Sequence, residues 1–219
     1  MRLYFFIILG LCMLCACSKV EPENNNPGVI VLDGDSRTDG WNCSYRYPYI
    51  DLLSIDDSCV IIKTSEGGNT TDSLLSRAAD RVDPLFIDSA KFNIVVVWCG
   101  VNDIAVQKKS KAEVFANLKK YCQYRRLAGW KVIICTEVSI KGHGFWGDFD
   151  QVRERMNDMI RMRWPGFCDG LADLARNPKI GAKGAYLDTL YFCDGKHLTN
   201  IGTQAVAAII NKSIIDLID

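Results

Sequence analysis

The stretch VIVLDGDSRTDGW, residues 29–41, indicates both how the chain folds and where its chemistry lies. Four apolar residues run directly into aspartate, glycine and serine, so a buried strand ends where reactive side chains begin. Uninterrupted apolar strands are typical of parallel sheets, whose two faces are both covered. Such sheets bind ligands beyond the carboxyl ends of their strands. The stretch therefore predicts a strand of a parallel sheet that opens on a functional site.

Segments of strand type and helix type alternate along the rest of the chain. The predicted strands cover 28–33, 59–64, 92–100 and 131–138, with a fifth near 168–172 or 186–188. The predicted helices cover about 45–54, 70–82, 111–128, 150–163 and 200–218. This alternation predicts a doubly wound α/β fold, with three α/β/α layers around a mainly parallel sheet of about five strands. The polar clusters that follow the strands are then expected to meet at one edge.

Length and composition limit the class of protein. The chain has 219 residues, of which 48% are hydrophobic, and 26 basic residues balance 26 acidic ones. This length fits one well-buried domain, which we place at 28–219. No basic block indicates a nucleic-acid partner, so the composition favours a small or neutral ligand.

The N-terminal residues differ from the rest of the chain. Arg2 precedes an apolar run that is too short to span a membrane and has the anatomy of a signal peptide, predicted at 1–16. The run ends in LCAC, which resembles the bacterial lipobox and implies a lipid on Cys17. The polar segment 17–27 would be a tether that joins the domain to a membrane of the cell envelope. We expect this membrane to be the outer one. A plain secretory signal or a buried helix are the alternatives.

Seven cysteines follow Cys17, and an odd number cannot pair completely. They show no CxxC spacing for zinc or redox chemistry. Cys99 and Cys135 lie in strongly apolar runs, so we expect them to be small buried side chains. The sequence leaves any disulfide pairing open. The seven are Cys43, Cys59, Cys99, Cys122, Cys135, Cys168 and Cys193.

The opening stretch allows two chemistries, and the first is a metal-dependent phosphotransferase. Asp33 and Asp35 resemble the paired aspartates of haloacid-dehalogenase-like enzymes, in which the first is the nucleophile beside Mg²⁺. Arg37, however, stands where those enzymes have threonine or valine, and it would compete with Mg²⁺ for the carboxylates. The only candidate for the later acidic pair is at 147–150. This is the weaker interpretation.

The second chemistry is that of a serine hydrolase with Ser36 as nucleophile. A serine nucleophile needs a base and a group that orients the base. The chain has two histidines, and His197 is favoured over His143 because it lies three residues after Asp194. One turn of chain then brings Asp194 to the imidazole, where it could fix the tautomer.

Three groups at strand ends could donate hydrogen bonds to an oxyanion. They are the backbone N–H of Ser36 at an expected helix start, the backbone N–H of Gly68, and the Asn102 side chain. Each residue also has a purely structural interpretation. Gly68 could form a turn with Gly67, Asn102 or Asp103 could cap a helix, and the Asp194 segment could be a surface turn. All of them together, at the predicted sheet edge, favour the functional interpretation.

These segments together resemble the SGNH (GDSL-type) hydrolase family. The resemblance rests on GDS at 34–36, Gly68 in EGGNTT, GVND at 100–103 and DGKH at 194–197, and it spans about 29–215. It implies a flavodoxin-like fold, with Ser36, Asp194 and His197 as the triad and no metal or cofactor. Ser36, Gly68 and Asn102 become the oxyanion hole. The G-x-S-x-G elbow of other α/β-hydrolases is absent.

The resemblance leaves several substrates open, namely acetylated carbohydrate, lysophospholipid or thioester. The aromatic residues near the site could pack on a sugar ring, or they could be ordinary core residues. The first interpretation makes short acyl groups on carbohydrate our first expectation. Arg37 replaces the usual leucine or isoleucine, and we expect it, with Asp35 and Trp41, to contact substrate. A monomer is expected. A non-catalytic glycan-binding surface lipoprotein is a further alternative. The aromatic residues are Trp41, Tyr45, Trp98 and Trp146.

Overall fold

A five-stranded parallel sheet forms the centre of the molecule. The computed structural model describes residues 26–41, 48–56, 58–142 and 149–219. The strand order is β2-β1-β3-β4-β5, and each neighbouring pair is parallel. The chain therefore moves outward from β1 in both directions, and the switch point lies between β1 and β3. The strands are β1 Val29–Gly34, β2 Val60–Lys63, β3 Asn93–Trp98, β4 Lys131–Cys135 and β5 Gly170–Ala172.

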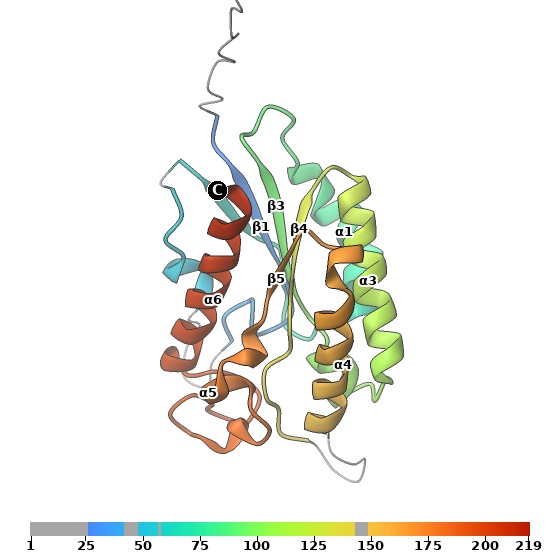
Figure 1. The fold of residues 1–219 in the computed structure, drawn as a ribbon, viewed down its shortest axis with the longest axis vertical. Helices are drawn as coiled ribbons and strands as arrows, with labels where there is room; N and C mark the ends of the chain where they lie inside the picture. Colours follow the sequence, from blue (N-terminus) through green and yellow to red (C-terminus); the bar gives the residue numbers. More distant parts are fainter. Residues whose placement is uncertain (1–25, 42–47, 57, 143–148) are drawn as a thin grey trace, which may run out of the picture.

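Helices cover both faces of this sheet, which confirms the predicted three-layer α/β/α fold (Figure 1). Alternate strand residues point to opposite faces, so each face has its own apolar core. Val31 and Val95 belong to the core shared with α1, α3 and α4, whereas Ile30 and Ile94 belong to the core shared with α6. The helices are α1 Thr71–Arg81, α2 Val101–Ala105, α3 Lys111–Leu127, α4 Phe149–Arg163, α5 Pro178–Gly181 and α6 Asn200–Ile218.

Local sequence signals set the starts of the longer helices. The Thr70 hydroxyl accepts the backbone N–H of Ser73 at the start of α1, and Ser110 and Glu113 form a reciprocal capping box at the start of α3. The chain turns from α3 into β4 at Gly129, whose φ is 97°. The four long predicted helices lie within one residue of their predicted bounds because these end signals are local.

One prediction of secondary structure is wrong, one open choice is resolved, and two short helices are new. The helix predicted at about 45–54 is, among the residues described there, only the 3₁₀ turn η1, Tyr49–Leu52, because Pro48 precedes it and extended Leu53 ends it. The fifth strand is the 168–172 candidate, since 186–188 overlaps the 3₁₀ turn η5, Ala185–Leu187. The short helices α2 and α5 were not predicted, because neither is long enough to show a helical period.

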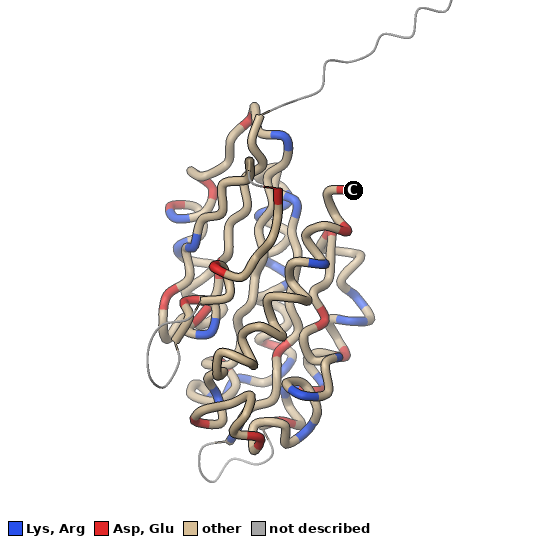
Figure 2. The backbone as a smooth tube through the Cα atoms, turned by 90° about the vertical axis from the view of Figure 1, so that its left-hand side faces the viewer, with Lys and Arg blue, Asp and Glu red and all other residues tan. Residues whose placement is uncertain are grey.

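The last helix, α6, is apolar because it is a core element. By length and hydropathy it is the one described helix that could cross a membrane. Val206, Ile210 and Ile214, however, pack at full burial in the core on its face of the sheet. Figure 2 shows basic and acidic residues interspersed along the backbone of the molecule, in agreement with the balanced composition.

The cysteines follow the expectation from their neighbours. Cys99 and Cys135 are buried and free, and burial raises the pKa of both thiols well above its usual range. Cys193 is disulfide-bonded, whereas the other five described cysteines are free. Several features of the sequence lie outside the described residues, namely the predicted signal peptide, the Cys17 anchor, Cys43 and nearly all of the tether.

Candidate active site

The predicted site lies at the switch point, where β1 and β3 end side by side. Gly34, the last residue of β1, is paired with Trp98, the last residue of β3. A Cβ on Gly34 would lie 2.2 Å from the Trp98 carbonyl oxygen, so only glycine fits this contact. The glycine of the GDS motif thus brings the turn that carries Ser36 against the loop that carries Asn102.

The sequence predicts that Ser36 lies at the start of a helix, and this prediction is wrong. Ser36 lies in a tight turn. The Asp39 N–H donates to the Asp35 carbonyl at 2.9 Å, and the Trp41 N–H donates to the Ser36 carbonyl at 2.8 Å. Residues 36–40 form turns, and no described helix begins there. The Ser36 N–H is therefore a local turn donor without the dipole of a helix behind it.

The structure brings Ser36, His197 and Asp194 together although 161 residues separate the serine from the histidine. Ser36 Oγ lies 3.0 Å from His197 Nε2, and His197 Nδ1 lies 2.7 Å from an Asp194 carboxylate oxygen. The other carboxylate oxygen accepts the backbone N–H groups of Lys196 at 2.8 Å and His197 at 2.7 Å. This chain of contacts is the arrangement in which a histidine activates a serine.

Asp194 remains ionised in this arrangement. Partial burial raises the pKa of the Asp194 carboxyl, but hydrogen bonds from the His197 ring and from the His197 and Lys196 backbone outweigh it. The net pKa lies well below the ordinary aspartate value. The carboxylate therefore offers a negative charge to the imidazole at neutral pH, which favours the tautomer with the proton on Nδ1.

A pocket of about 320 Å³ opens over Ser36 and His197. Two larger hollows, of about 370 and 550 Å³, lie elsewhere, and neither lining contains a serine–histidine pair. Size alone therefore does not identify the functional site, whereas the side-chain chemistry does. The lining residues are Ser36, Trp41, Gly67, Gly68, Asn102, Lys196 and His197.

All three predicted oxyanion donors line this pocket. Within the described chain, the backbone N–H groups of Ser36 and Gly68 donate to no backbone or side-chain acceptor. Asn102 uses one amide hydrogen on the Asn69 carbonyl at 2.8 Å and keeps the second. Gly68 has a φ of 85°, a conformation that glycine adopts without strain. A Cβ on Gly67 would meet the Trp41 ring at 3.4 Å, so both glycines lie beside the pocket.

The polar residues next to these donors hold the loops in place. The Asn69 amide donates to the Gly34 carbonyl at 2.9 Å and thereby joins the second loop to the first. Asp103 accepts both the backbone N–H and the hydroxyl of Thr71, at 2.9 and 2.6 Å. The structural interpretation of a helix cap therefore holds for Asp103, which receives the first N–H of α1, whereas Asn102 faces the pocket.

Asp35 and Arg37 do not lie where a substrate could contact them, which corrects the expectation from sequence. Their side chains are 0% and 1% exposed. The Arg37 guanidinium turns inward, forms an ion pair with Glu137 and lies 4.5 Å from the centre of the Trp98 ring. Burial raises the pKa of Glu137 to about 7 despite the attraction of Arg37. Sequence reasoning missed Glu137, whose only signal was its position just after β4.

Asp33 is likewise a structural residue. Its carboxylate is completely buried, forms an ion pair with Arg77 and accepts the Tyr121 hydroxyl at 2.6 Å. Its partner in the phosphotransferase hypothesis, Asp35, faces Arg37. Basic side chains thus occupy both carboxylates, and the described residues contain no group of three or more potential metal ligands. This donor set does not fit a Mg²⁺ site.

Trp41 is the aromatic residue that the structure places at the pocket. It is 51% exposed, and its ring centre lies 6.1 Å from that of His197. Trp98 is a core residue, in agreement with the alternative interpretation. Tyr45, Trp146 and the second histidine, His143, lie outside the described residues.

Comparison with known proteins adds evidence that is independent of this geometry. Residues 34–205 match the model of the GDSL-like Lipase/Acylhydrolase family. A comparison with curated proteins found no match. The solved structures described next have low sequence identity to this chain, so their similarity shows the fold alone.

Three solved structures illustrate this similarity. A lipolytic protein of the G-D-S-L family from Veillonella parvula has a TM-score of 0.71 and 18% identity, covering 87% of this chain and 100% of its own. A catalytic mutant of Axe2, an acetylxylan esterase from Geobacillus stearothermophilus, has a TM-score of 0.63 and 16% identity, with 85% and 93% covered. The acetyl xylan esterase AlAXEase has a TM-score of 0.59 and 22% identity, with 85% and 99% covered.

Proposed function

Since the chain belongs to the GDSL-like lipase/acylhydrolase family and is an ester-hydrolysing enzyme, we propose that it removes short acyl groups, above all acetyl, from carbohydrate by way of an acyl-enzyme on Ser36. The observation that carries the proposal is the continuous contact from Ser36 Oγ through His197 to Asp194, at 3.0 and 2.7 Å. A serine held by a histidine whose tautomer is fixed is a nucleophile for acyl transfer.

The reaction has two halves that use the same residues. Ser36 Oγ attacks the ester carbonyl carbon while its proton passes to His197 Nε2, and Asp194 stabilises the resulting imidazolium. The carbonyl oxygen becomes an oxyanion, to which the free donors of Ser36, Gly68 and Asn102 would hydrogen-bond. The alcohol leaves with the proton from His197. A water molecule then gives a proton to His197 and attacks the acyl carbonyl, and His197 returns that proton to Ser36 Oγ as the acid leaves.

The pocket supports the choice of substrate. Its volume of about 320 Å³ lies at the lower end of the range for drug-sized ligands, which leaves room for an acetyl group beside Ser36. The half-exposed ring of Trp41 beside His197 offers an apolar face on which a sugar ring could pack. Two of the similar structures are described as acetylxylan esterases, which agrees with the proposal without extending to this chain. Lysophospholipid or thioester substrates would call for a longer apolar channel.

The test compares the wild type with Ser36→Ala. A fluorophosphonate probe is expected to label the wild type and not the variant, and the rate with p-nitrophenyl acetate is expected to fall at least about 10³-fold. Ser65→Ala is a matched control because Ser65 follows β2 in the same region but does not line the pocket. The octanoate ester is expected to react more slowly than the acetate. Unchanged activity in Ser36→Ala would overturn the proposal, and EDTA sensitivity without labelling would favour a metal-dependent enzyme.

We also propose that Cys17 carries a lipid that anchors the enzyme to a membrane of the cell envelope. The support is the lipobox-like LCAC at 14–17, followed by a polar segment. A single acyl chain binds membranes only marginally, whereas several chains on one cysteine anchor a protein stably.

A further inference from the structure

Two lysines accompany the loop that carries the proposed base. Lys196 lines the pocket together with Ser36 and His197. Lys141 donates its backbone N–H to the Gly195 carbonyl at 2.8 Å. A Cβ on Gly195 would lie 2.7 Å from Lys141 Cβ, so the two segments are in contact. The segment of Lys141 thus packs against the loop that carries Lys196 and His197, and only Lys196 lines the pocket.

Neither lysine side chain forms an ion pair with a carboxylate of the described residues. This distinguishes both from the basic residues on the neighbouring loops, which acidic residues neutralise. Lys63 binds Asp39 at 2.7 Å, Arg81 binds Glu66 at 2.8 Å, Lys109 binds Asp72 and Asp103, and Arg37 binds Glu137.

The described lining of the pocket contains one charged side chain of the lysine, arginine and carboxylate types, that of Lys196. No aspartate or glutamate is among its described lining residues. Asp194 is close, but its two oxygens accept the His197 ring and the backbone N–H groups of Lys196 and His197. A pocket lined by charge of one sign attracts substrates of the opposite sign. Among the described residues that line the pocket, Lys196 is the one lysine, arginine, aspartate or glutamate, and the ionised Asp194 beside it is held by the His197 ring.

Building on the proposed esterase function, we infer that Lys196 binds a carboxylate next to the scissile ester, which makes acylated acidic glycans such as polyuronides the substrate class. The ammonium is a compact charge on a flexible stem and suits a carboxylate that recurs along a polymer. The sequence had suggested Arg37 for this role, but Arg37 is buried and already neutralised. Lys196 is partly exposed and lines the pocket, and no carboxylate of the described residues forms an ion pair with its side chain.

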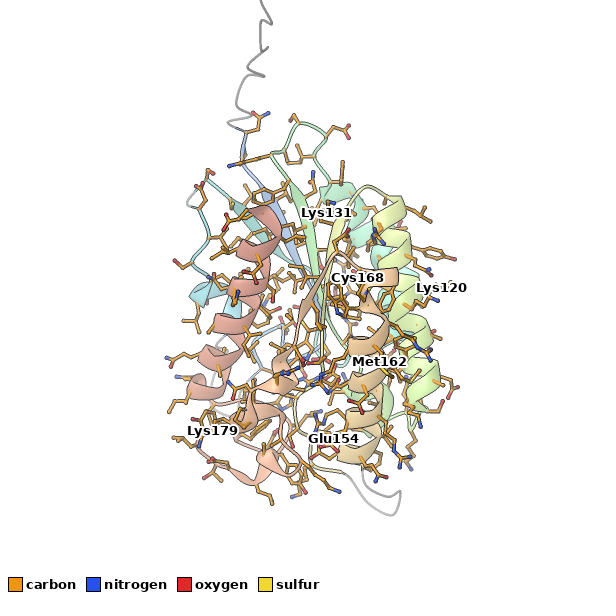
Figure 3. The ribbon with its side chains drawn as sticks, viewed as in Figure 1. Lys120, Lys131, Glu154, Met162, Cys168 and Lys179 are labelled. Atoms are coloured by element: carbon orange, nitrogen blue, oxygen red, sulfur yellow. The ribbon has the colours of Figure 1, made fainter. Side chains whose placement is uncertain are left out.

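The experiment measures kcat/KM for acetate release from O-acetylated polygalacturonate and from O-acetylated xylan. The readout is the ratio of the acidic to the neutral substrate, so that a general loss of activity cancels. The variants are Lys196→Gln and Lys196→Glu. Lys131→Gln is the control, since Lys131 begins β4 at the end of the sheet opposite to the pocket (Figure 3).

We expect Lys196→Gln to lower this ratio about three- to tenfold, and Lys196→Glu to lower it further, while Lys131→Gln leaves it unchanged. Raising the salt concentration is expected to lower the wild-type ratio toward that of Lys196→Gln, because salt screens an exposed charge. An equal ratio in the wild type and Lys196→Gln would overturn the inference. If Ser36→Ala retains wild-type activity on the neutral xylan, the proposed function itself fails, and the two failures are distinguishable.

Discussion

At the scale of single residues, Asp194 is the side chain whose role depends most on its charge. Asp194→Asn keeps the size but removes the acceptor that fixes the imidazole tautomer, so kcat for p-nitrophenyl acetate is expected to fall at least about 10²-fold. Asp188→Asn is the matched control, because Asp188 lies on the same segment and accepts only local backbone N–H groups near it. Equal activity of the two variants would remove Asp194 from the mechanism.

The low pKa of Asp194 also determines how the pH profile should be read. Folding lowers the pKa of the Asp194 carboxyl, so the ionised carboxylate stabilises the folded protein at every pH above the ordinary aspartate pKa. This stabilisation is lost only as the pH falls through the lowered pKa of the folded state. Asp194 therefore does not titrate between about pH 5 and pH 8. A loss of rate on acidification in that range therefore does not come from Asp194, and a carboxyl of Asp194 that NMR shows to titrate there would contradict this conclusion.

At the scale of structural elements, the contact between β1 and β3 depends on Gly34. A Cβ at this position would lie 2.2 Å from the Trp98 carbonyl and 2.7 Å from the Thr38 hydroxyl, so Gly34→Ala must displace backbone. We expect it to lower the free energy of unfolding by about 2 kcal/mol or more, measured by urea denaturation. In Gly166→Ala, the control, the new Cβ meets no atom within 4 Å. Similar unfolding midpoints for the two variants would contradict the close contact.

The ion pair between Arg37 and Glu137 joins the turn after β1 to the end of β4. Both side chains are almost completely buried, so Arg37→Met leaves a carboxylate without a partner and is expected to cost about 3–5 kcal/mol of stability. The double variant Arg37→Met, Glu137→Met replaces the pair by apolar side chains and is expected to regain most of this loss. Thermal unfolding of the single and double variants measures the coupling. Additive losses would show that the pair does not act as a unit.

At the scale of the whole molecule, the start of the domain and the pocket lie at opposite ends of the sheet. The Asn26 side chain donates to the Ser89 carbonyl at 2.6 Å, next to the start of β1, whereas Ser36 follows the end of β1 (Figure 1). Cys17→Ser is therefore expected to move the enzyme from the membrane fraction to the soluble fraction with unchanged kcat/KM, measured on fractionated cells. Activity that stays with the membranes would contradict the proposed anchor.

Sequence alone was sufficient for the features that depend on local chemistry. Apolar runs of Val and Ile predicted the sheet because parallel strands are buried on both faces, and apolar residues at three- and four-residue spacing predicted the long helices. The GDS, GVND and DGKH motifs named Ser36, Asn102 and His197 because each follows a predicted strand or precedes a predicted helix. The short helices escaped prediction because they are shorter than the period that reveals them.

Only the tertiary structure decided where each charged side chain points. Arg37, beside the nucleophile in sequence, turns into the core because Glu137, a hundred residues away, supplies a buried opposite charge. Asp33 and Asp35 are adjacent to the site but neutralised within the core, whereas Lys196 lines the pocket without a partner among the described residues. Motifs record which groups are near the chemistry along the chain. Burial and the pairing of distant charges determine which of them face the substrate, and neither is visible in local sequence.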